Sequence, residues 1–161
     1  MKIMVQRVSA ATVDVVDERS GEVDASFAKQ SIGAGLVLLV GVADSDGAQE
    51  VAYAARKIAG MRIFEDESGK MNRSVVDTGG DILSISQFTL FADCKHGNRP
   101  SFVSAGKPEH ARAVWEELNQ ALADQGITVK TGRFGAHMRV SLTNDGPVTI
   151  PLDTDQLMPK N

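Results

Sequence analysis

The chain has 161 residues, of which 42% are hydrophobic and 24% charged, and its net charge is −4. This length suits one well-cored domain, the composition excludes an intrinsically disordered chain, and the acidic charge argues against broad, non-specific nucleic-acid binding. No apolar run approaches the ~20 residues of a membrane-spanning helix, and the polar start is unlike a signal peptide. The single cysteine, Cys94, excludes an internal disulfide. We therefore expect a cytoplasmic protein without membrane contact.

Alternation of apolar and polar residues, together with short apolar runs, predicts the strands. In chain order they are 3–8, 12–16, 36–42, 61–64, 82–91, 127–130, 137–142 and 148–150. The run at 36–42 is continuously apolar, as in a central strand that is buried on both faces. The polar stretch 17–24 is expected to form a loop or hairpin tip. Turn-forming residues at 144–147 predict a hairpin between the last two strands.

Two amphipathic helices are expected between these strands. Apolar residues recur at helical spacing from Val51 to Ile58, after helix-capping residues at 44–46. A second helix is expected to begin at Pro108 and to end before Gly126. Two helices among many strands predict a single α/β domain with a mixed sheet and helices on one side. Sheet surface left without a helix favours a homodimer.

The most informative stretch is 82–91, which is apolar enough for a buried strand yet carries Ser86, Gln87 and Thr89 near its end. Buried hydroxyl and amide groups need hydrogen-bond partners, so a core strand seldom contains them without a reason. The stretch runs into a polar loop at 92–101, and loops on rigid strands often carry functional groups. An ordinary strand whose polar side chains bind neighbouring backbone is the alternative.

Residue spacing alone identifies no catalytic or metal site. The three histidines, His96, His110 and His137, lie in different predicted elements, and Cys94 near His96 lacks the further ligands of a zinc site. Glycine-rich phosphate-binding motifs and a GxSxG nucleophile motif are absent. Cys94 paired with His96, or Thr89, could act as a nucleophile, but spacing places no acid or base beside Thr89.

Four motifs, in this order, together resemble the D-aminoacyl-tRNA deacylase family, in its D-tyrosyl-tRNA deacylase type. They are SQFTL at 86–90, RPSF at 99–102, TGRFGA at 131–136 and NDGPVT at 144–149, and the resemblance extends over 1–150. It implies a three-layer sandwich of mixed sheet and helices that forms a homodimer, with a deacylase domain at 1–152 and a flexible tail at 153–161. It also implies no metal and no organic cofactor.

The activity that this resemblance implies is chirality proofreading in translation. Members hydrolyse the ester between a D-amino acid and the 3′ end of tRNA, act on glycyl-tRNA mischarged on tRNA(Ala), and reject L-aminoacyl-tRNA. The resemblance assigns the 3′ end of the tRNA to the active site. Two rival functions stay open: a small-molecule esterase or amidase with Thr89 or Cys94 as nucleophile, and a non-catalytic tRNA-binding dimer.

The resemblance also implies roles for particular residues. The backbone N–H groups of Phe88 and Thr89 would hold the ester carbonyl, with Ser86 and Gln87 beside them as catalytic residues. A cis dipeptide, Gly146–Pro147, would enter the pocket of the partner subunit, leave no room for an L side chain, and so discriminate by exclusion. Three further residues are expected to bind substrate: Arg7, Phe102 and Met138.

Some positions depart from the family pattern. The insert at 17–26 is longer than usual, and the tail extends past the usual end. His137 stands where family members often carry an acidic residue. Lys95, Arg99 and Arg133 are expected to help grip the tRNA end. None of these departures falls on the SQFTL or NDGPVT motif.

Overall fold

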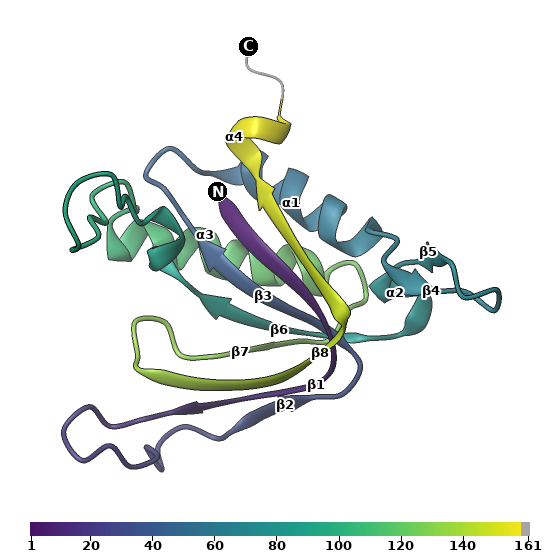
Figure 1. Cartoon of the computed structure of the whole chain (residues 1–161), viewed down its shortest axis with the longest axis horizontal. Coiled ribbons are helices and arrows are strands. Elements are labelled where there is room, and N and C mark those ends of the chain that lie inside the picture. The colour runs from purple at the N-terminus through teal and green to yellow at the C-terminus, as the bar shows by residue number, and fades with distance from the viewer. Residues whose placement is uncertain (159–161) are drawn as a thin grey trace.

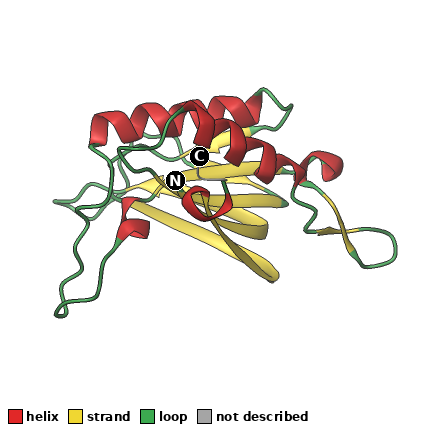
Figure 2. Ribbon diagram, turned by 90° about the horizontal axis from the view of Figure 1, so that it is seen from above, coloured by secondary structure: helices red, strands yellow, loops and turns green. Residues whose placement is uncertain are grey.

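A six-stranded mixed sheet, covered on one face by two long helices, forms the body of the computed structural model, which describes residues 1–158 (Figures 1 and 2). The strands are β1 (Lys2–Val15), β2 (Gln30–Ile32), β3 (Gly35–Gly41), β6 (Asp81–Ser86), β7 (Val129–Thr131) and β8 (Met138–Asp153). They run in the order β2-β1-β3-β6-β7, and β8 pairs with β1. The pairs β3–β6 and β6–β7 are parallel, whereas β1 is antiparallel to β2, β3 and β8. The expected single α/β domain with a mixed sheet is confirmed.

The two covering helices are α1 (Ala48–Gly60) and α3 (Pro108–Ala123), as expected from their apolar spacing. Shorter elements complete the chain: β4 (Phe64–Glu65), β5 (Met71–Arg73), α2 (Val75–Thr78), the 3-10 helix η1 (Phe88–Phe91) and α4 (Thr154–Leu157). Strands β4 and β5 form a separate antiparallel hairpin that projects from the body (Figure 1).

Two apolar cores lie on opposite faces of the central strands. The larger core joins α1 and α3 to the sheet through residues such as Ile58, Leu118 and Leu38. The other core packs Val37 and Leu83 against residues of β2 and of the distal part of β1, with β8 alongside. Strands β3 and β6 are therefore buried on both faces, which explains the continuous apolar run predicted at 36–42.

Two long strands replace four of the predicted strands. Apart from Val16, the predicted strands at 3–8 and 12–16 belong to the single strand β1. Apart from His137, those at 137–142 and 148–150 belong to β8. The expected hairpin at 144–147 is therefore wrong. Both halves of β8 pair with β1, so the extra residues between them form a bulge in place of a turn, where the register shifts near Gln6 and Val8.

Other boundaries also differ from the predictions. Strand β6 ends at Ser86, and the next residues form η1, so that Phe88 is 58% exposed and does not lie in a buried strand. The tail expected to be flexible from residue 153 is ordered at its start, because Asp153 ends β8 and the next four residues form α4. Residues 159–161 lie outside the described residues.

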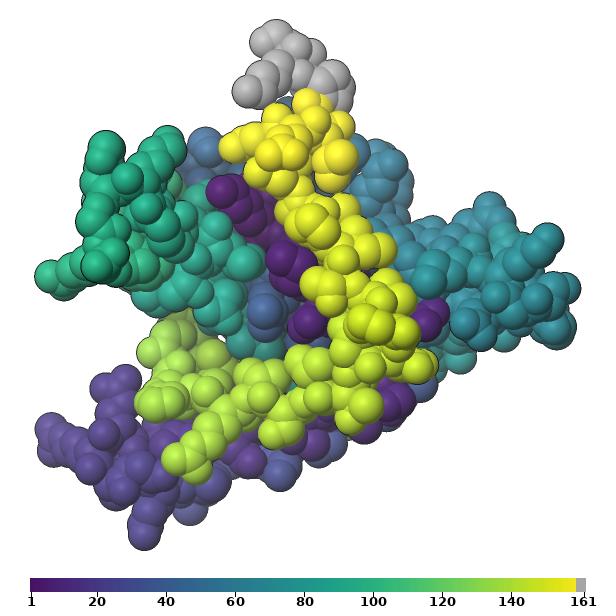
Figure 3. All heavy atoms as spheres, in the orientation of Figure 1, coloured from purple at the N-terminus to yellow at the C-terminus, as the bar shows by residue number. Residues whose placement is uncertain are grey.

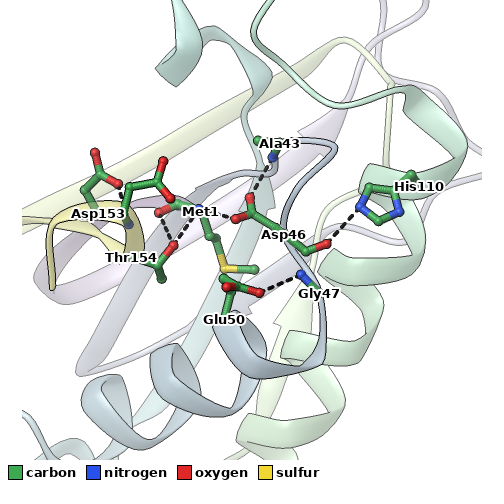
Figure 4. A network of polar contacts seen from close by, with 9 residues as sticks. Met1, Ala43, Asp46, Gly47, Glu50, His110, Asp153 and Thr154 are labelled. Carbon is green, nitrogen blue, oxygen red and sulfur yellow. Dashed lines mark hydrogen bonds and ion pairs between the residues drawn. The ribbon is translucent and has the colours of Figure 1, made fainter. Parts of the chain in front are cut away.

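The α-ammonium group of Met1 is buried in a polar network that joins the chain ends (Figure 4). It donates to Asp46 Oδ1 at 2.6 Å and to Thr154 Oγ1 at 2.7 Å. The other oxygen of Asp46 accepts from the Ala43 N–H at 2.7 Å, and His110 Nε2 donates to the Asp46 carbonyl at 2.9 Å. Asp46, predicted as part of a helix cap, is therefore the counter-ion of a buried charge that ties together β1, α3 and α4.

Candidate functional site

A cavity of about 600 Å³, here called the main cavity, opens beyond the carboxyl ends of β3 and β6. Ligands of α/β sheets commonly bind at this position, because the strands end there and the following loops converge. Its walls come from the ends of these strands, from η1, from the 102–108 segment, from α3 and from residues 134–140. Figure 3 shows the hollow between the teal and the yellow-green parts of the chain.

Several of the predicted site residues line the main cavity. They are Ser86, Gln87, Phe88, Phe102 and Met138. The residues come from three separate stretches of sequence, and the fold brings them together. Sequence motifs that look unrelated along the chain thus share one cavity.

The turn that follows β6 presents backbone donors at the edge of the main cavity. The Gln87 N–H donates to the Val40 carbonyl at 2.7 Å, which holds the start of the turn against β3. Phe88 and Thr89 then begin η1, and the first N–H groups of a helix have no acceptor within it. Among residues 1–158 no acceptor for either group is found. These two N–H groups can therefore bind an oxygen of a ligand.

The side chains of this turn are held by their neighbours. The Gln87 amide donates to the Thr89 hydroxyl, so this polar contact of the hydroxyl is with an amide and not with a base. The Phe88 ring packs edge-to-face against Phe102, with 5.2 Å between the ring centroids. The main cavity thus has an aromatic rim beside the two backbone donors.

Trp115 and Phe134 also line the main cavity, and neither was predicted as a site residue. Trp115 is buried, and its indole N–H donates to the Ser84 hydroxyl at 3.0 Å. The rings of Trp115 and Phe134 lie 5.9 Å apart. Ser84 could have indicated this contact from the sequence, since a hydroxyl inside the apolar strand β6 requires a hydrogen-bond partner. Trp115 itself falls on the core-facing side of its helix and so resembles an ordinary core residue.

Met138 lines the main cavity, and its side chain packs against Gly132. A Cβ atom at Gly132 would collide with the sulfur atom of Met138. The Gly132 N–H also donates to the Ser84 carbonyl at 3.2 Å, which continues the pairing of β7 with β6. His137, the departure from the family pattern, lies exposed on the same wall.

Arg7, Gly146 and Pro147 form a second group that does not line the main cavity of the same chain. The Gly146–Pro147 bond is cis, as the family resemblance implies. Arg7 is only 6% exposed, and it donates through Nε to the Asp145 carbonyl at 2.8 Å and through Nη1 to the Ile63 carbonyl at 2.6 Å. This buried guanidinium connects the bulge of β8 to the segment before β4.

Asn144 closes the same bulge, and sequence reasoning assigned it no role of its own. Its Oδ1 accepts from the Val148 N–H at 2.7 Å, and its Nδ2 donates to the Val148 carbonyl at 3.0 Å. The Asn144 side chain therefore makes the two backbone hydrogen bonds that a neighbouring strand would otherwise make with Val148. Two side chains, Arg7 and Asn144, hold the dipeptide Gly146–Pro147 from opposite ends.

Of the residues considered as alternative nucleophiles or metal ligands, only His137 lines the main cavity. Cys94 is exposed in the loop after η1 and does not line it. The described residues contain no group of three or more His, Cys, Asp or Glu side chains that could hold a metal ion. Within the same part of the chain, no helix has the length and apolar character needed to cross a membrane.

The insert at 17–26 contacts the TGRFGA motif through Arg133, which pairs with Asp24 and donates to the Ser26 hydroxyl. Arg133 Nη1 lies 2.8 Å from Asp24 Oδ2, and its guanidinium stacks on the Phe27 ring at 5.4 Å. Hydrogen bonds from the hydroxyl and N–H of Ser26, and then the contact with Arg133, hold the pKa of the Asp24 carboxyl below its usual value. Arg133, expected to help grip tRNA, is therefore already paired within the chain.

Comparison with known proteins decides the family. The family model for D-Tyr-tRNA(Tyr) deacylase matches residues 4–153. The chain belongs to this family. A D-aminoacyl-tRNA deacylase of Bifidobacterium adolescentis is 65% identical and covers 98% of this chain and 99% of its own. A D-aminoacyl-tRNA deacylase from Lactobacillus delbrueckii subsp. bulgaricus is 53% identical and covers 95% of this chain and 99% of its own.

Solved structures agree on the fold of this deacylase-family chain. A structure of the c-Myc DNA Unwinding Element Binding Protein has a TM-score of 0.81 and 39% identity, with 95% of this chain and 98% of that chain covered. A probable eukaryotic D-amino acid tRNA deacylase has a TM-score of 0.74, with 94% of this chain and 97% of that chain covered. At 16% identity the second match concerns the fold alone.

Proposed function

We propose that this family member hydrolyses the ester that joins a D-amino acid to the 3′ end of tRNA, and that it rejects L-aminoacyl-tRNA. The observation that carries the proposal is a pair of unpartnered N–H groups, that of Phe88, which lines the main cavity, and that of Thr89, the next residue of η1. An ester carbonyl placed there develops negative charge as water attacks, and preorganised donors stabilise that charge.

The chemistry proposed for this site needs no side-chain nucleophile. Among the described residues, the side-chain hydrogen bond found for the Thr89 hydroxyl is the one that it accepts from the Gln87 amide. The 2′-hydroxyl of the terminal ribose is then the nearest group of the substrate itself that can orient or activate the attacking water. Ser86 and Gln87 hold the turn in shape, and Phe102 and Met138 enclose the aminoacyl group.

Chiral selection is proposed to come from the dipeptide Gly146–Pro147 of a second subunit. The dipeptide lies outside the main cavity of its own chain and is held firmly by Arg7 and Asn144. In a homodimer it would face the α-amino group of the substrate and occupy the space that an L side chain needs. Glycyl-tRNA has no side chain to exclude and is accepted on the same argument.

Two substitutions at Thr89 separate the contribution of its hydroxyl to catalysis from that of its backbone N–H group. Thr89→Ala removes the hydroxyl but keeps the N–H group, and we expect kcat/KM for D-tyrosyl-tRNA to stay within roughly tenfold of the parent. Thr89→Pro removes the N–H group, and the loss of one oxyanion donor costs about 10²–10³ in rate. If Thr89→Ala is as inactive as Thr89→Pro, the hydroxyl is essential and the backbone mechanism is wrong.

Turnover of D-tyrosyl-tRNA against L-tyrosyl-tRNA tests the proposed function itself. We expect release of D-tyrosine and no release of L-tyrosine under the same conditions. Equal hydrolysis of both substrates would favour a non-selective esterase. Hydrolysis of neither would favour the nucleic-acid-binding alternative, which the name of one structural relative, the c-Myc DNA Unwinding Element Binding Protein, also raises.

Location in the cytoplasm and independence from metal ions and organic cofactors remain predictions. Hydrolysis of an activated ester needs only water, donors for the oxyanion and a positioned carbonyl. Activity that survives dialysis against a chelator would support the proposed mechanism, and activity that returns only with an added metal would contradict it.

A further inference from the structure

A second hollow of about 390 Å³ lies on the far side of the Trp115–Phe134 wall, between α3 and the edge strand β7. We call it the α3–β7 groove, and residues that line it include Arg112, Trp115, Asn119, Thr131, Arg133 and Phe134. Trp115 and Phe134 line both the groove and the main cavity. The two hollows are therefore neighbours that share one aromatic wall.

Asn119, which lines the groove, carries a buried oxygen atom, Oδ1, that accepts no hydrogen bond from the described residues. A buried acceptor without a donor is unfavourable, because it has lost its hydrogen bond to water and gained none in return. The terminal torsion of asparagine is soft, so a small rotation can present this oxygen to a donor in the groove.

A cation above an aromatic ring lies two helical turns away from Asn119 on α3. The Arg112 guanidinium is 5.6 Å from the centre of the Phe134 ring. Its ion pair with Glu116 has a separation of 3.5 Å, and both side chains are more than half exposed. Such exposed pairs contribute little, so Arg112 can exchange Glu116 for a phosphate oxygen.

The direction of the substrate follows from the proposed position of the ester. With the ester at Phe88 and Thr89, a terminal adenosine that lies along the main cavity would reach Trp115 and Phe134, which line it. Because the same two residues line the α3–β7 groove, the preceding nucleotide would lie beside that groove. In tRNA this nucleotide is an unpaired cytosine, because the 3′ end is the single strand C-C-A.

We propose that the α3–β7 groove binds the cytidine nucleotide that precedes the terminal adenosine of the substrate. The exocyclic amine of cytosine is a donor and matches the unpartnered oxygen of Asn119. Unpaired bases are commonly held by stacking on aromatic rings or guanidinium planes, which Phe134 and Arg112 supply. The inference rests on the proposed function, since it takes the ester position from it.

The test compares two substrates that differ only in the upstream nucleotides, D-tyrosyl-tRNA and 3′-O-(D-tyrosyl)adenosine. We expect the ratio of their kcat/KM values to fall roughly fivefold to tenfold in Asn119→Ala and in Arg112→Ala, as one hydrogen bond or one stacked contact is lost. Arg56→Ala is the matched control, since Arg56 also lies over an aromatic ring, 5.5 Å from the centre of Tyr53, but on α1.

Each possible change in the ratio of kcat/KM values either supports or overturns the proposed cytidine site. A ratio that stays constant in both variants overturns the inference, and so does an equal loss on both substrates, which would assign these side chains to folding or to the main cavity. A parent protein that cleaves neither substrate would instead overturn the proposed function. Trp115 is the only tryptophan in the chain, so quenching of its fluorescence by the trinucleotide C-C-A, beyond that by adenosine, checks binding without catalysis.

Discussion

Gly146→Ala is expected to lower kcat/KM for D-tyrosyl-tRNA by roughly 100-fold or more, because displacement of a positioning group by about 1 Å can cost that much. The φ angle of Gly146 is +146°, where side chains are rarely tolerated. A Cβ atom there would lie 2.7 Å from Val148 Cγ2 and 3.2 Å from Arg7 Nη2. The bulge must therefore move, and the dipeptide that it carries moves with it.

Gly69→Ala provides the matched control for this variant. Gly69 also has a positive φ angle, +74°, but a Cβ atom there would meet nothing within 4 Å. It should show the cost of backbone strain without loss of deacylation. If Gly146→Ala keeps the parent rate and the parent preference for D over L substrate, the proposed role of the dipeptide is wrong.

Mixing two inactive variants tests whether the dipeptide acts in the partner subunit. A heterodimer of a Gly146→Ala chain and a Thr89→Pro chain has one main cavity with intact donors that faces an intact dipeptide. Activity should therefore return on mixing and refolding the two chains. No recovery, despite heterodimer formation, would place the dipeptide and the donors of each site in one chain.

Asp46→Ala is expected to destabilise the fold by about 3–5 kcal/mol, the usual cost of leaving one member of a buried ion pair without its partner. The Met1 α-ammonium group and the Asp46 carboxylate are 2.6 Å apart, with side-chain exposures of 0% and 2%. The variant would also leave the Ala43 N–H without its acceptor. For a chain of this size the change corresponds to a fall in Tm of roughly 10 °C.

Thermal unfolding followed by circular dichroism measures this effect, with Asp44→Ala as the control. The Asp44 carboxylate also accepts a backbone hydrogen bond, from Lys107 at 2.8 Å, but it lies at the exposed surface. We expect a loss of about 1 kcal/mol for this control. Equal Tm values for the two variants would mean that the buried pair contributes no more than a surface hydrogen bond.

The elements that were predicted correctly are those with strong local patterns. Helices α1 and α3 and strand β3 follow from apolar spacing within one segment, and such spacing does not depend on distant residues. The family motifs were equally accessible, because each is a short run of letters. The family assignment made from them is confirmed by the match over residues 4–153.

The elements that were predicted wrongly depend on partners far along the chain. Residues 144–147 have the composition of a hairpin turn, yet both flanking segments pair with β1, and a continuous partner strand turns the hairpin into a bulge. Likewise, Trp115 has the spacing of a core residue, and only its contact with Ser84 places it in the wall of a cavity.

The sequence by itself determined the fold class, the family and the SQFTL and NDGPVT segments, because periodicity and short motifs are properties of neighbouring residues. Only the tertiary structure decided that the β6 strand stops at Ser86, which frees the N–H groups of Phe88 and Thr89. It also decided that Gly146 and Pro147 lie outside their own main cavity. The physical reason is the same in both cases: strand pairing and burial fix where a backbone group points, and their partners are distant in the chain.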